Sequence, residues 1–331
     1  MVRIGLLGAG TMGAAHAAAY AVLSDVEVVG VYSRDQDRAR SVASICQAKP
    51  VDEASALIEA GDIDAIDVCL PTPVHRSFVI PALDCGKHVF CETPLALGLE
   101  DAHAMRDAAR RAGRLLQVGL LMRSVSAYQH LKAAVASGEH GRLLSLSTFR
   151  LGSYLRPEKP DYKPHYGDPC IELMTFDFDV VNWLMGRPAR LSAAGTGEIT
   201  ALLGYDDHRS ATVMASGLMP VGFPFSVGFR ALFEGACFEL HTVFESGPPR
   251  STFTMAENSA APRPVPLVGR NPYEVELKGF VDCIRGTADP DVLDVERAIE
   301  ALALSLAARR ALAEGQSVAV QVESHRLKGW V

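Results

Sequence analysis

The first third of the chain alternates short apolar runs with longer segments that carry polar residues at helical spacing. Apolar runs bounded by glycine, proline or charged residues predict strands, and the segments between them predict helices. The predicted strands are residues 2–7, 26–32, 65–70, 88–91 and 115–119, and the predicted helices are residues 14–23, 35–44, 52–60, 74–85, 99–112 and 124–137. Strands that alternate with helices form a parallel, doubly wound sheet, whose ligands bind beyond the carboxyl ends of the strands.

The pattern changes after Gly141. Residues 223–233 alternate apolar and other residues with period two, which is typical of an antiparallel strand with one covered face. Further strands are predicted at residues 142–150, 189–197, 199–205, 210–218, 237–244 and 318–322, and helices at residues 169–185, 273–285 and 295–314, with Asp168 as the N-cap of the first. Two proline-rich stretches, residues 157–169 and 248–266, predict loops.

These two patterns predict an α/β protein of two domains. Residues 1–122 form an N-terminal Rossmann domain with a doubly wound parallel sheet, and residues 123–331 form a C-terminal α+β domain with a large, mostly antiparallel open sheet. We expect the last two helices to be able to pack back on the first domain.

Composition and charge restrict the partners. The chain has 331 residues, 48% of them hydrophobic, and a net charge of -7 without any basic run, which argues against nucleic acid and anionic membranes. No apolar run approaches the roughly 20 residues of a membrane span, and the chain enters its first strand without a charged leader, so we expect a cytoplasmic protein. Seven scattered cysteines without a C-x-x-C pair, and histidines without ligand spacing, predict neither disulfides nor a metal site.

A glycine-rich turn follows the first strand. Gly8, Gly10 and Gly13 have the G-x-G-x-x-G spacing, with Thr11 and Met12 between them. In this motif the first glycine allows the turn, the second lets a pyrophosphate approach the backbone, and the third lets helix and strand pack closely. The position directly after an N-terminal strand predicts a dinucleotide site.

The end of the second strand distinguishes the two nicotinamide cofactors. An acid there holds the ribose 2′-hydroxyl of NAD, whereas a small hydroxyl residue and an arginine accept the 2′-phosphate of NADP. This chain has Ser33 and Arg34, with Arg38 one helical turn later, so NADP(H) is favoured and NAD(H) remains possible. The alternative interpretation makes Ser33 a helix N-cap, Arg34 a solvated side chain and Asp35 an acid that complements the helix dipole.

Several further motifs together resemble the Gfo/Idh/MocA family, the family of glucose-fructose oxidoreductase and inositol dehydrogenase. They are Pro71-Thr72-Pro73-Val74-His75, Glu92-Thr93-Pro94, Arg123, Ser137-Gly138-Glu139-His140-Gly141, Trp183-Leu184-Met185-Gly186 and Asn271-Pro272-Tyr273. The resemblance covers nearly the whole chain. It implies an NAD(P)-dependent oxidoreductase that acts on a sugar, cyclitol or related polyol and assembles as a homodimer or homotetramer through the C-terminal sheet. It also implies that the cofactor cleft is lined by Leu70, Pro71, Thr72, His75, Glu92 and Thr93.

The chain departs from the family pattern at two positions. Family members usually have a lysine where this chain has Thr93, and an Asp and a His four residues apart where it has Glu172 and Phe176. Hydride transfer from a hydroxyl still needs an acceptor for the proton. The candidates are Glu172, then His165, Lys163 or Tyr166, with Thr93 as a hydrogen-bonding group; Arg123, Tyr162, Thr175 and Phe176 are expected beside the substrate.

Several alternatives, in which these residues have only structural roles or face solvent, stay open. Lys163 and His165 could be solvated loop residues, His75 a helix-start histidine, and Arg123 a bridge between the domains. Asp177 and Asp179 could each pair with an arginine or a backbone group.

We therefore predict an NADP-preferring oxidoreductase that moves hydride to or from a small carbonyl or alcohol substrate. Three alternatives remain. The protein could reduce an imine or an enone, it could be a redox-neutral nucleotide-dependent glycoside hydrolase or lyase, or it could bind the nucleotide without catalysis.

Overall fold

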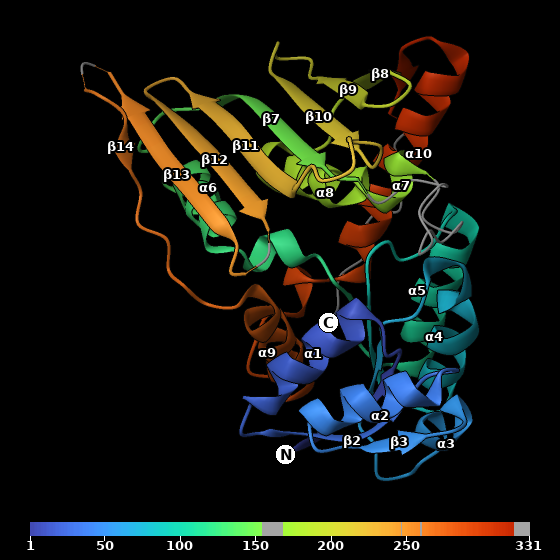
Figure 1. The fold of residues 1–331 in the computed structure, drawn as a ribbon. Coiled ribbons are helices and arrows are strands. Elements are labelled where there is room, and N and C mark those ends of the chain that lie inside the picture. The colour runs from blue at the N-terminus through green and yellow to red at the C-terminus, as the bar shows by residue number, and fades with distance from the viewer. Residues whose placement is uncertain (154–167, 246, 259, 321–331) are drawn as a thin grey trace.

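The computed structural model describes residues 1–153, 168–245, 247–258 and 260–320. Two sheets make up the molecule, a parallel sheet at the bottom of Figure 1 and a larger sheet above it. The predicted α/β architecture with two kinds of sheet is confirmed. None of the helices in these ranges is both long enough and apolar enough to span a lipid bilayer.

The first sheet has six parallel strands in the order β3-β2-β1-β4-β5-β6. The strands are β1 (Val2–Leu7), β2 (Val26–Tyr32), β3 (Lys49–Val51), β4 (Ala65–Val68), β5 (His88–Cys91) and β6 (Leu116–Val118). The helices of this half are α1 (Thr11–Ala21), α2 (Gln36–Ile45), α3 (Ala54–Ile58), α4 (His75–Asp84) and α5 (Leu99–Ala112). Strand order reverses between β1 and β4, which is where ligands bind in such sheets.

Strand β3 was not predicted, and the helix expected at residues 52–60 covers only Ala54–Ile58. The strand is three residues long, is mostly exposed and contains Pro50. It has no apolar alternation because it lies at the edge of the sheet, where a proline and polar side chains are tolerated.

The second sheet has nine strands in the order β14-β13-β12-β11-β7-β10-β9-β8-β15. Its strands are β7 (Leu143–Leu151), β8 (Arg190–Ala194), β9 (Ile199–Gly204), β10 (Ser210–Ser216), β11 (Phe225–Phe233), β12 (Ala236–Phe244), β13 (Arg250–Glu257), β14 (Arg263–Pro264) and β15 (Val318–Ala319). All neighbours are antiparallel except β7 and β10.

The loop predicted at residues 248–266 is wrong, because β13 and β14 lie there. Strand β13 pairs with β12 from Val243↔Arg250 to Ala236↔Glu257, and it buries Phe253 and Met255. Serine, threonine and proline dominate the surrounding sequence, and only these two apolar side chains mark the covered face.

The helices of the second half are α6 (Ser126–Ser137), α7 (Pro169–Glu172), α8 (Met174–Met185), α9 (Pro272–Ile284) and α10 (Val295–Glu314), with short 3-10 turns η1 (Thr72–Val74), η2 (Leu121–Ser124) and η3 (Pro290–Val292) along the chain. Asp168 caps α7 as predicted, since its side chain accepts a hydrogen bond from Cys170 N. The single helix predicted at residues 169–185 is divided into α7 and α8 at Leu173.

Helices α9 and α10 return to the first domain, where α9 lies beside α1 (Figure 1). Leu277, Phe280 and Val281 of α9 and Leu302 of α10 belong to the hydrophobic core around the parallel sheet. Leu304 and Ala308, farther along α10, belong to the core beneath the second sheet. One helix therefore contributes to both cores.

Candidate active site

In the glycine turn between β1 and α1, Gly8 and Gly13 have no room for a side chain, whereas Gly10 has open space beside it. Gly8 has φ +117°, and a Cβ there would lie 2.3 Å from the Cys69 carbonyl oxygen. A Cβ on Gly13 would lie 2.0 Å from the Gly8 carbonyl oxygen, whereas one on Gly10 would meet nothing within 4 Å. No side chain caps the N-terminus of α1, which starts at Thr11 and Met12. Free N–H groups facing open space beside Gly10 fit a pyrophosphate.

The turn after β2 places charged groups around the start of α2. Asp35 caps this helix by accepting from Asp37 N and Arg38 N, and its carboxylate also lies 3.2 Å from Arg38 Nε. Ser33 Oγ accepts a hydrogen bond from Asp35 N at 3.2 Å. Arg34 is exposed and makes no hydrogen bond or ion pair with the residues that the structure describes. Asp35, rather than Ser33, is thus the N-cap.

The loop after β4 is held by a buried histidine. His75 is 1% exposed, with Nε2 2.7 Å from the Leu70 carbonyl oxygen and Nδ1 3.1 Å from that of Leu95. Burial lowers the pKa of His75, so the ring is neutral at neutral pH. Its ring braces the backbone of the loop. Pro71 is exposed, and Thr72 is nearly buried.

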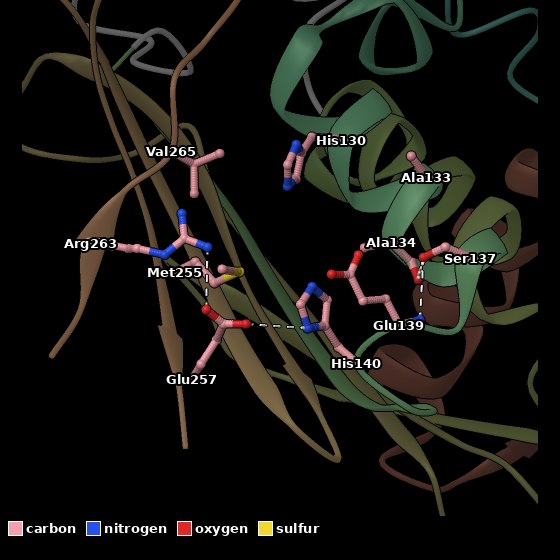
Figure 2. Close-up of a pocket in the computed structure, with 10 residues that line it drawn as sticks. All are labelled: His130, Ala133, Ala134, Ser137, Glu139, His140, Met255, Glu257, Arg263 and Val265. Atoms are coloured by element: carbon pink, nitrogen blue, oxygen red, sulfur yellow. Dashed lines mark hydrogen bonds and ion pairs between the residues drawn. The ribbon is translucent and has the colours of Figure 1, made fainter. Parts of the chain in front are cut away.

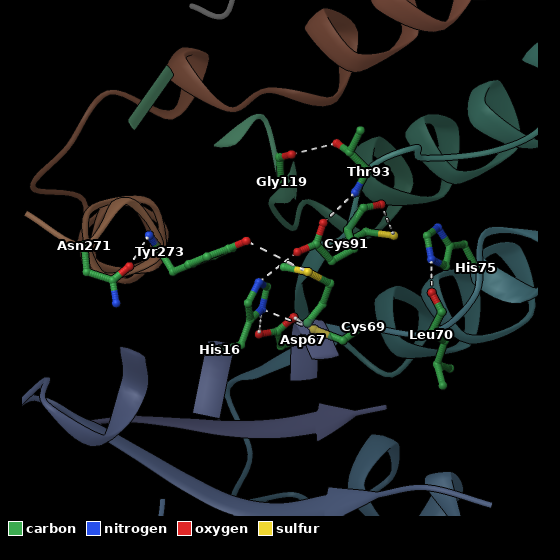
Figure 3. A network of polar contacts seen from close by, with 12 residues as sticks. His16, Asp67, Cys69, Leu70, His75, Cys91, Thr93, Gly119, Asn271 and Tyr273 are labelled. Carbon is green, nitrogen blue, oxygen red and sulfur yellow. Dashed lines mark hydrogen bonds and ion pairs between the residues drawn. The ribbon is translucent and has the colours of Figure 1, made fainter. Parts of the chain in front are cut away.

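Glu92 and Thr93 follow β5 at the same edge of the sheet. Figure 3 shows Thr93 beside Gly119. Glu92 Oε2 accepts from Thr93 N at 3.0 Å, and Thr93 Oγ1 donates to the Gly119 carbonyl oxygen at 2.7 Å. The threonine hydroxyl therefore has a backbone partner that fixes its direction.

Beneath these residues lies a buried polar cluster that the sequence interpretation missed. His16 of α1 is fully buried, with Nδ1 2.8 Å from Asp67 Oδ2 and 3.2 Å from Cys69 Sγ, and with Nε2 2.9 Å from Glu92 Oε1. His16, Asp67 and Cys69 are of metal-ligating types, and their ligand-type atoms lie within 4.8 Å of one another. Because these atoms contact one another directly, we interpret the group as a hydrogen-bonded cluster.

One signal could have revealed this cluster. Asp67 is a charged residue inside an otherwise apolar strand, and a carboxylate buried at 0% exposure requires a partner. The identity of that partner follows only from the three-dimensional arrangement, since His16 is 51 positions away.

Helix α9 adds Tyr273 to this region. Its hydroxyl lies 3.9 Å from Met12 Sδ, and its ring lies 5.8 Å from the His16 ring, centroid to centroid. Burial and the charge of Glu92 raise the pKa of Tyr273 to about 12, so the phenol is protonated at neutral pH. A residue from the end of the chain thus lies against the glycine turn at its start.

Glu172 at the end of α7 has a carboxyl group without a hydrogen-bond or ion-pair partner in the described ranges. Burial, with a smaller contribution from Asp168, raises its pKa to about 7. A carboxyl group with this pKa can both hold and release a proton near neutral pH.

The other two predicted residues of this helical segment face different neighbours. Thr175 is 2% exposed, and its hydroxyl contacts the Ile171 carbonyl oxygen at 2.7 Å and Ser305 Oγ at 2.6 Å, so it packs against α10. Phe176 is half-buried beneath the Arg150 guanidinium, which lies 4.7 Å from the ring centroid. Arg150 in turn pairs with buried Asp177 at 3.0 Å.

Arg123 has the contacts of a bridge between the two halves. Its guanidinium pairs with Asp179 of α8 at 2.6 Å and donates to the Val292 carbonyl oxygen at 2.9 Å, and only 6% of the residue is exposed. The remaining predicted site residues, Tyr162, Lys163, His165 and Tyr166, lie outside the described residues.

A separate hollow of about 310 Å³ lies between α6 and the β13–β14 edge of the second sheet (Figure 2). Met255 and Val265 form part of its wall, and His130, His140 and Arg263 stand around it. It contains none of the predicted site residues.

Comparison with known proteins agrees with this geometry. Residues 2–120 match the Gfo/Idh/MocA family model, described as an oxidoreductase family with an NAD-binding Rossmann fold. The chain is 29% identical to 1,5-anhydro-D-fructose reductase of Ensifer adhaerens, over 97% of this chain and 99% of the relative. It is 32% identical to inositol 2-dehydrogenase of Acidothermus cellulolyticus, over 64% of this chain and 62% of the relative.

A solved structure shares the fold. Levoglucosan dehydrogenase, in complex with NADH and levoglucosan, superposes with a TM-score of 0.81 at 20% identity, covering 97% of this chain and all of that one.

Proposed function

We propose, from the match of residues 2–120 to the family model and from the relatives above, that the chain is an NAD(P)-dependent oxidoreductase of the Gfo/Idh/MocA family that prefers NADP(H) and acts on a sugar, a cyclitol or a related small carbonyl or alcohol compound. When bound, the nicotinamide supplies or accepts a hydride at its C4 carbon. The observation that carries the proposal is the uncapped start of α1 beside the open face of Gly10.

The residues after β2 support the preference for NADP. Asp35 already caps α2 and faces Arg38, so its carboxylate is occupied where an NAD site would need an acid for the ribose. Arg34 projects into solvent next to the Ser33 hydroxyl, and this combination suits a 2′-phosphate.

Glu172 is the proposed proton donor and acceptor. Alcohol oxidation releases a proton that a carboxylate can take, and carbonyl reduction needs a proton that a carboxylic acid can give. With a pKa of about 7, Glu172 exists in both forms near neutral pH. Thr93 would add a directed hydrogen-bond acceptor, because its hydroxyl proton is already donated to the Gly119 carbonyl.

The substrate class rests on the relatives. The names of the two relatives above describe enzymes that act on an anhydrosugar ketone and on inositol. We propose a substrate of the same polyhydroxylated kind. We further propose that the protein is a homodimer or homotetramer that associates through the outer face of the second sheet.

Replacing Arg34 with alanine tests the cofactor assignment. We expect Arg34→Ala to weaken NADPH binding about tenfold or more while NADH binding changes little, because only the 2′-phosphate is lost as a partner. Titration of nucleotide fluorescence measures both affinities. Arg40→Ala, at an exposed position of α2 where the arginine is paired with Asp37, is the matched control and should bind both nucleotides like the wild type.

Equal losses for both nucleotides in Arg34→Ala would remove the 2′-phosphate assignment. NADPH oxidation against a panel of sugars, cyclitols and imines then tests the reaction itself. Product formation without a net change in nicotinamide absorbance would instead favour a redox-neutral reaction.

A further inference from the structure

We propose that His16 is a positioning residue. Its doubly protonated ring lies between Asp67 and Glu92 and thereby fixes the Glu92 carboxylate at the edge of the cofactor cleft. This inference rests on the proposed function, since it requires a nicotinamide nucleotide beside Glu92. It adds a residue that touches neither substrate nor cofactor, and it makes nucleotide affinity depend on pH.

The geometry gives each ring nitrogen of His16 one carboxylate. Nδ1 is hydrogen-bonded to Asp67 at 2.8 Å and lies 3.2 Å from Cys69 Sγ, whereas Nε2 lies 2.9 Å from Glu92 in an ion pair that lacks hydrogen-bond alignment. A neutral imidazole has only one N–H to donate. Both contacts are favourable only when the ring carries two protons. The ring packs edge-on against Phe90 at 5.7 Å and lies tilted against Tyr273 at 5.8 Å, so aromatic rings border it on two sides.

The Glu92 carboxylate is thus held on two sides. One oxygen faces His16, and the other accepts the backbone N–H of Thr93. Gly119 leaves no spare room, since a Cβ there would lie 3.0 Å from Glu92 Oε2. A neutral ring that donated to Asp67 would present a lone pair to Glu92, and the carboxylate would lose one of its two supports.

The surrounding groups keep the proton on His16. Burial by itself lowers the pKa of His16, but the neighbouring Cys69 and Asp67 outweigh it and raise the pKa well above its ordinary value. Burial and the Asp67 carboxylate raise the pKa of Cys69, and the His16 ring lowers it.

The buried acidic side chains of α1 and α9, the two helices that pack here, are neutral. Burial raises the pKa of Tyr20 on α1, and it raises those of Tyr273 and Glu276 on α9. The Glu276 carboxyl is 1% exposed and neither of its oxygens has a hydrogen-bond partner, as expected for a protonated acid in an apolar place. His16 is therefore the cation of this cluster, and it lies between Asp67 and Glu92.

The direction of the pH dependence follows. A histidine with a raised pKa is charged at neutral pH and loses its proton only as the pH rises through that raised value. Nucleotide affinity should therefore be constant around neutral pH and fall in alkaline solution. The fall should disappear when residue 16 cannot titrate.

The experiment measures NADPH affinity by fluorescence from about pH 6 to about pH 10, where histidine with a raised pKa titrates. His16→Asn keeps an amide near Asp67 but is too short to reach Glu92, and His16→Gln can still donate to Glu92. We expect His16→Asn to lose about tenfold to a hundredfold in affinity at neutral pH, the range for a hydrogen bond to a charged group. His16→Gln should recover most of this loss and show no alkaline fall.

His88→Gln is the matched control, because His88 is a half-buried histidine at the start of β5 that accepts from Leu115 N instead. Thermal melting shows whether each variant is folded. If His16→Asn does not fold, the wild-type pH profile and His16→Gln decide.

Three outcomes overturn the proposal. They are wild-type affinity in folded His16→Asn, a wild-type profile that stays flat into alkaline solution, and an alkaline fall that persists in His16→Gln. A wild-type protein that binds neither nicotinamide nucleotide at any pH is a different result, because it removes the proposed function itself.

Discussion

Glu172 is a half-buried carboxyl group that has no ion-pair partner among the residues that the structure describes. Its pKa of about 7 has burial as the main cause, and the nearby Asp168 adds repulsion in the same direction. Each 1.36 kcal/mol of such differential stabilisation moves a pKa by about one unit. A carboxyl group with this pKa exists in both protonation states near neutral pH, whereas an ordinary exposed glutamate is ionised there.

Replacing Glu172 with glutamine removes the proton and keeps the shape. We expect Glu172→Gln to lower turnover about a hundredfold or more, with nucleotide affinity unchanged. In the wild type, carbonyl reduction should slow and alcohol oxidation should speed up as the pH rises through about 7, because the first needs the acid form and the second the base form. Steady-state rates across pH measure both effects.

Glu198→Gln, in an exposed loop between β8 and β9, is the control for the loss of one negative charge. Rates equal to the wild type in Glu172→Gln would exclude this residue from the reaction.

At the scale of residues, the sequence predicted the residues that belong to a local motif. Gly8, Gly10 and Gly13 lie within six positions of one another, and the turn has the expected form. The sequence did not predict the cluster around His16, because the cluster joins α1 to the carboxyl ends of β4 and β5, which are far apart along the chain. Thr175 was expected beside the substrate, but the break at Leu173 and the contact with Ser305 turn it toward α10.

At the scale of elements, the β1–turn–α1 unit is closely packed at Gly8 and Gly13 and has open space beside Gly10. Gly13 brings the first turn of α1 onto the backbone of Gly8, and Gly8 brings that backbone onto Cys69. Gly10 has φ -85°, which any residue can adopt, and has open space beside it. A glycine at position 10 is therefore not required by the fold of the free chain.

Alanine at these two positions should give opposite results. We expect Gly10→Ala to fold with unchanged stability but to bind NADPH at least about tenfold more weakly, because the new methyl group occupies the space of the pyrophosphate. We expect Gly13→Ala to lose about 1–3 kcal/mol of stability or more, because the backbone must move away from the Gly8 oxygen. Urea unfolding and fluorescence titration separate the two effects.

Gly61→Ala, which also meets nothing within 4 Å but lies away from the turn, is the control for Gly10→Ala. Normal NADPH binding by Gly10→Ala would show that the phosphates lie elsewhere.

Periodicity predicted the long elements and missed the short ones at sheet edges. Helix α5 was predicted at its observed residues, Leu99–Ala112, and α10 matches residues 295–314. Strands β3, β13 and β14 lie at or near the edges of their sheets. One side of β3 and of β14 faces solvent, and on one side β13 pairs with β14, which is two residues long. Polar side chains and prolines are common there, so the apolar signal that marks a strand is weak.

At the scale of the whole molecule, the second sheet has one face covered by α8 and another that faces outward (Figure 1). A cross-strand row on the outward face runs through Leu202, Thr212, Ser147, Arg230 and Glu239. Leu202 is 49% exposed, and Leu232 nearby on β11 is 43% exposed. Large apolar side chains on a broad exposed sheet suit association with a second copy.

We expect the wild type to sediment as a dimer or tetramer and Leu202→Glu to shift it toward monomer, because the charge would be buried at the interface. Analytical ultracentrifugation measures the change, and circular dichroism verifies the fold. Val22→Glu, an exposed apolar residue at the end of α1, is the control and should leave assembly unchanged. A monomeric wild type would contradict association through this face.

The return of α9 and α10 has a consequence for how such chains can be recombined. Helices α9 and α10 return to the core of the parallel sheet, whereas β15, which follows them, pairs with β8 of the second sheet, so the described chain crosses between the two halves three times. A fragment cut after residue 122 would leave Phe280, Val281 and Leu302 missing from its interior. Grafting a new specificity onto this scaffold therefore requires a splice point at each of these crossings, including the one at the end of α10.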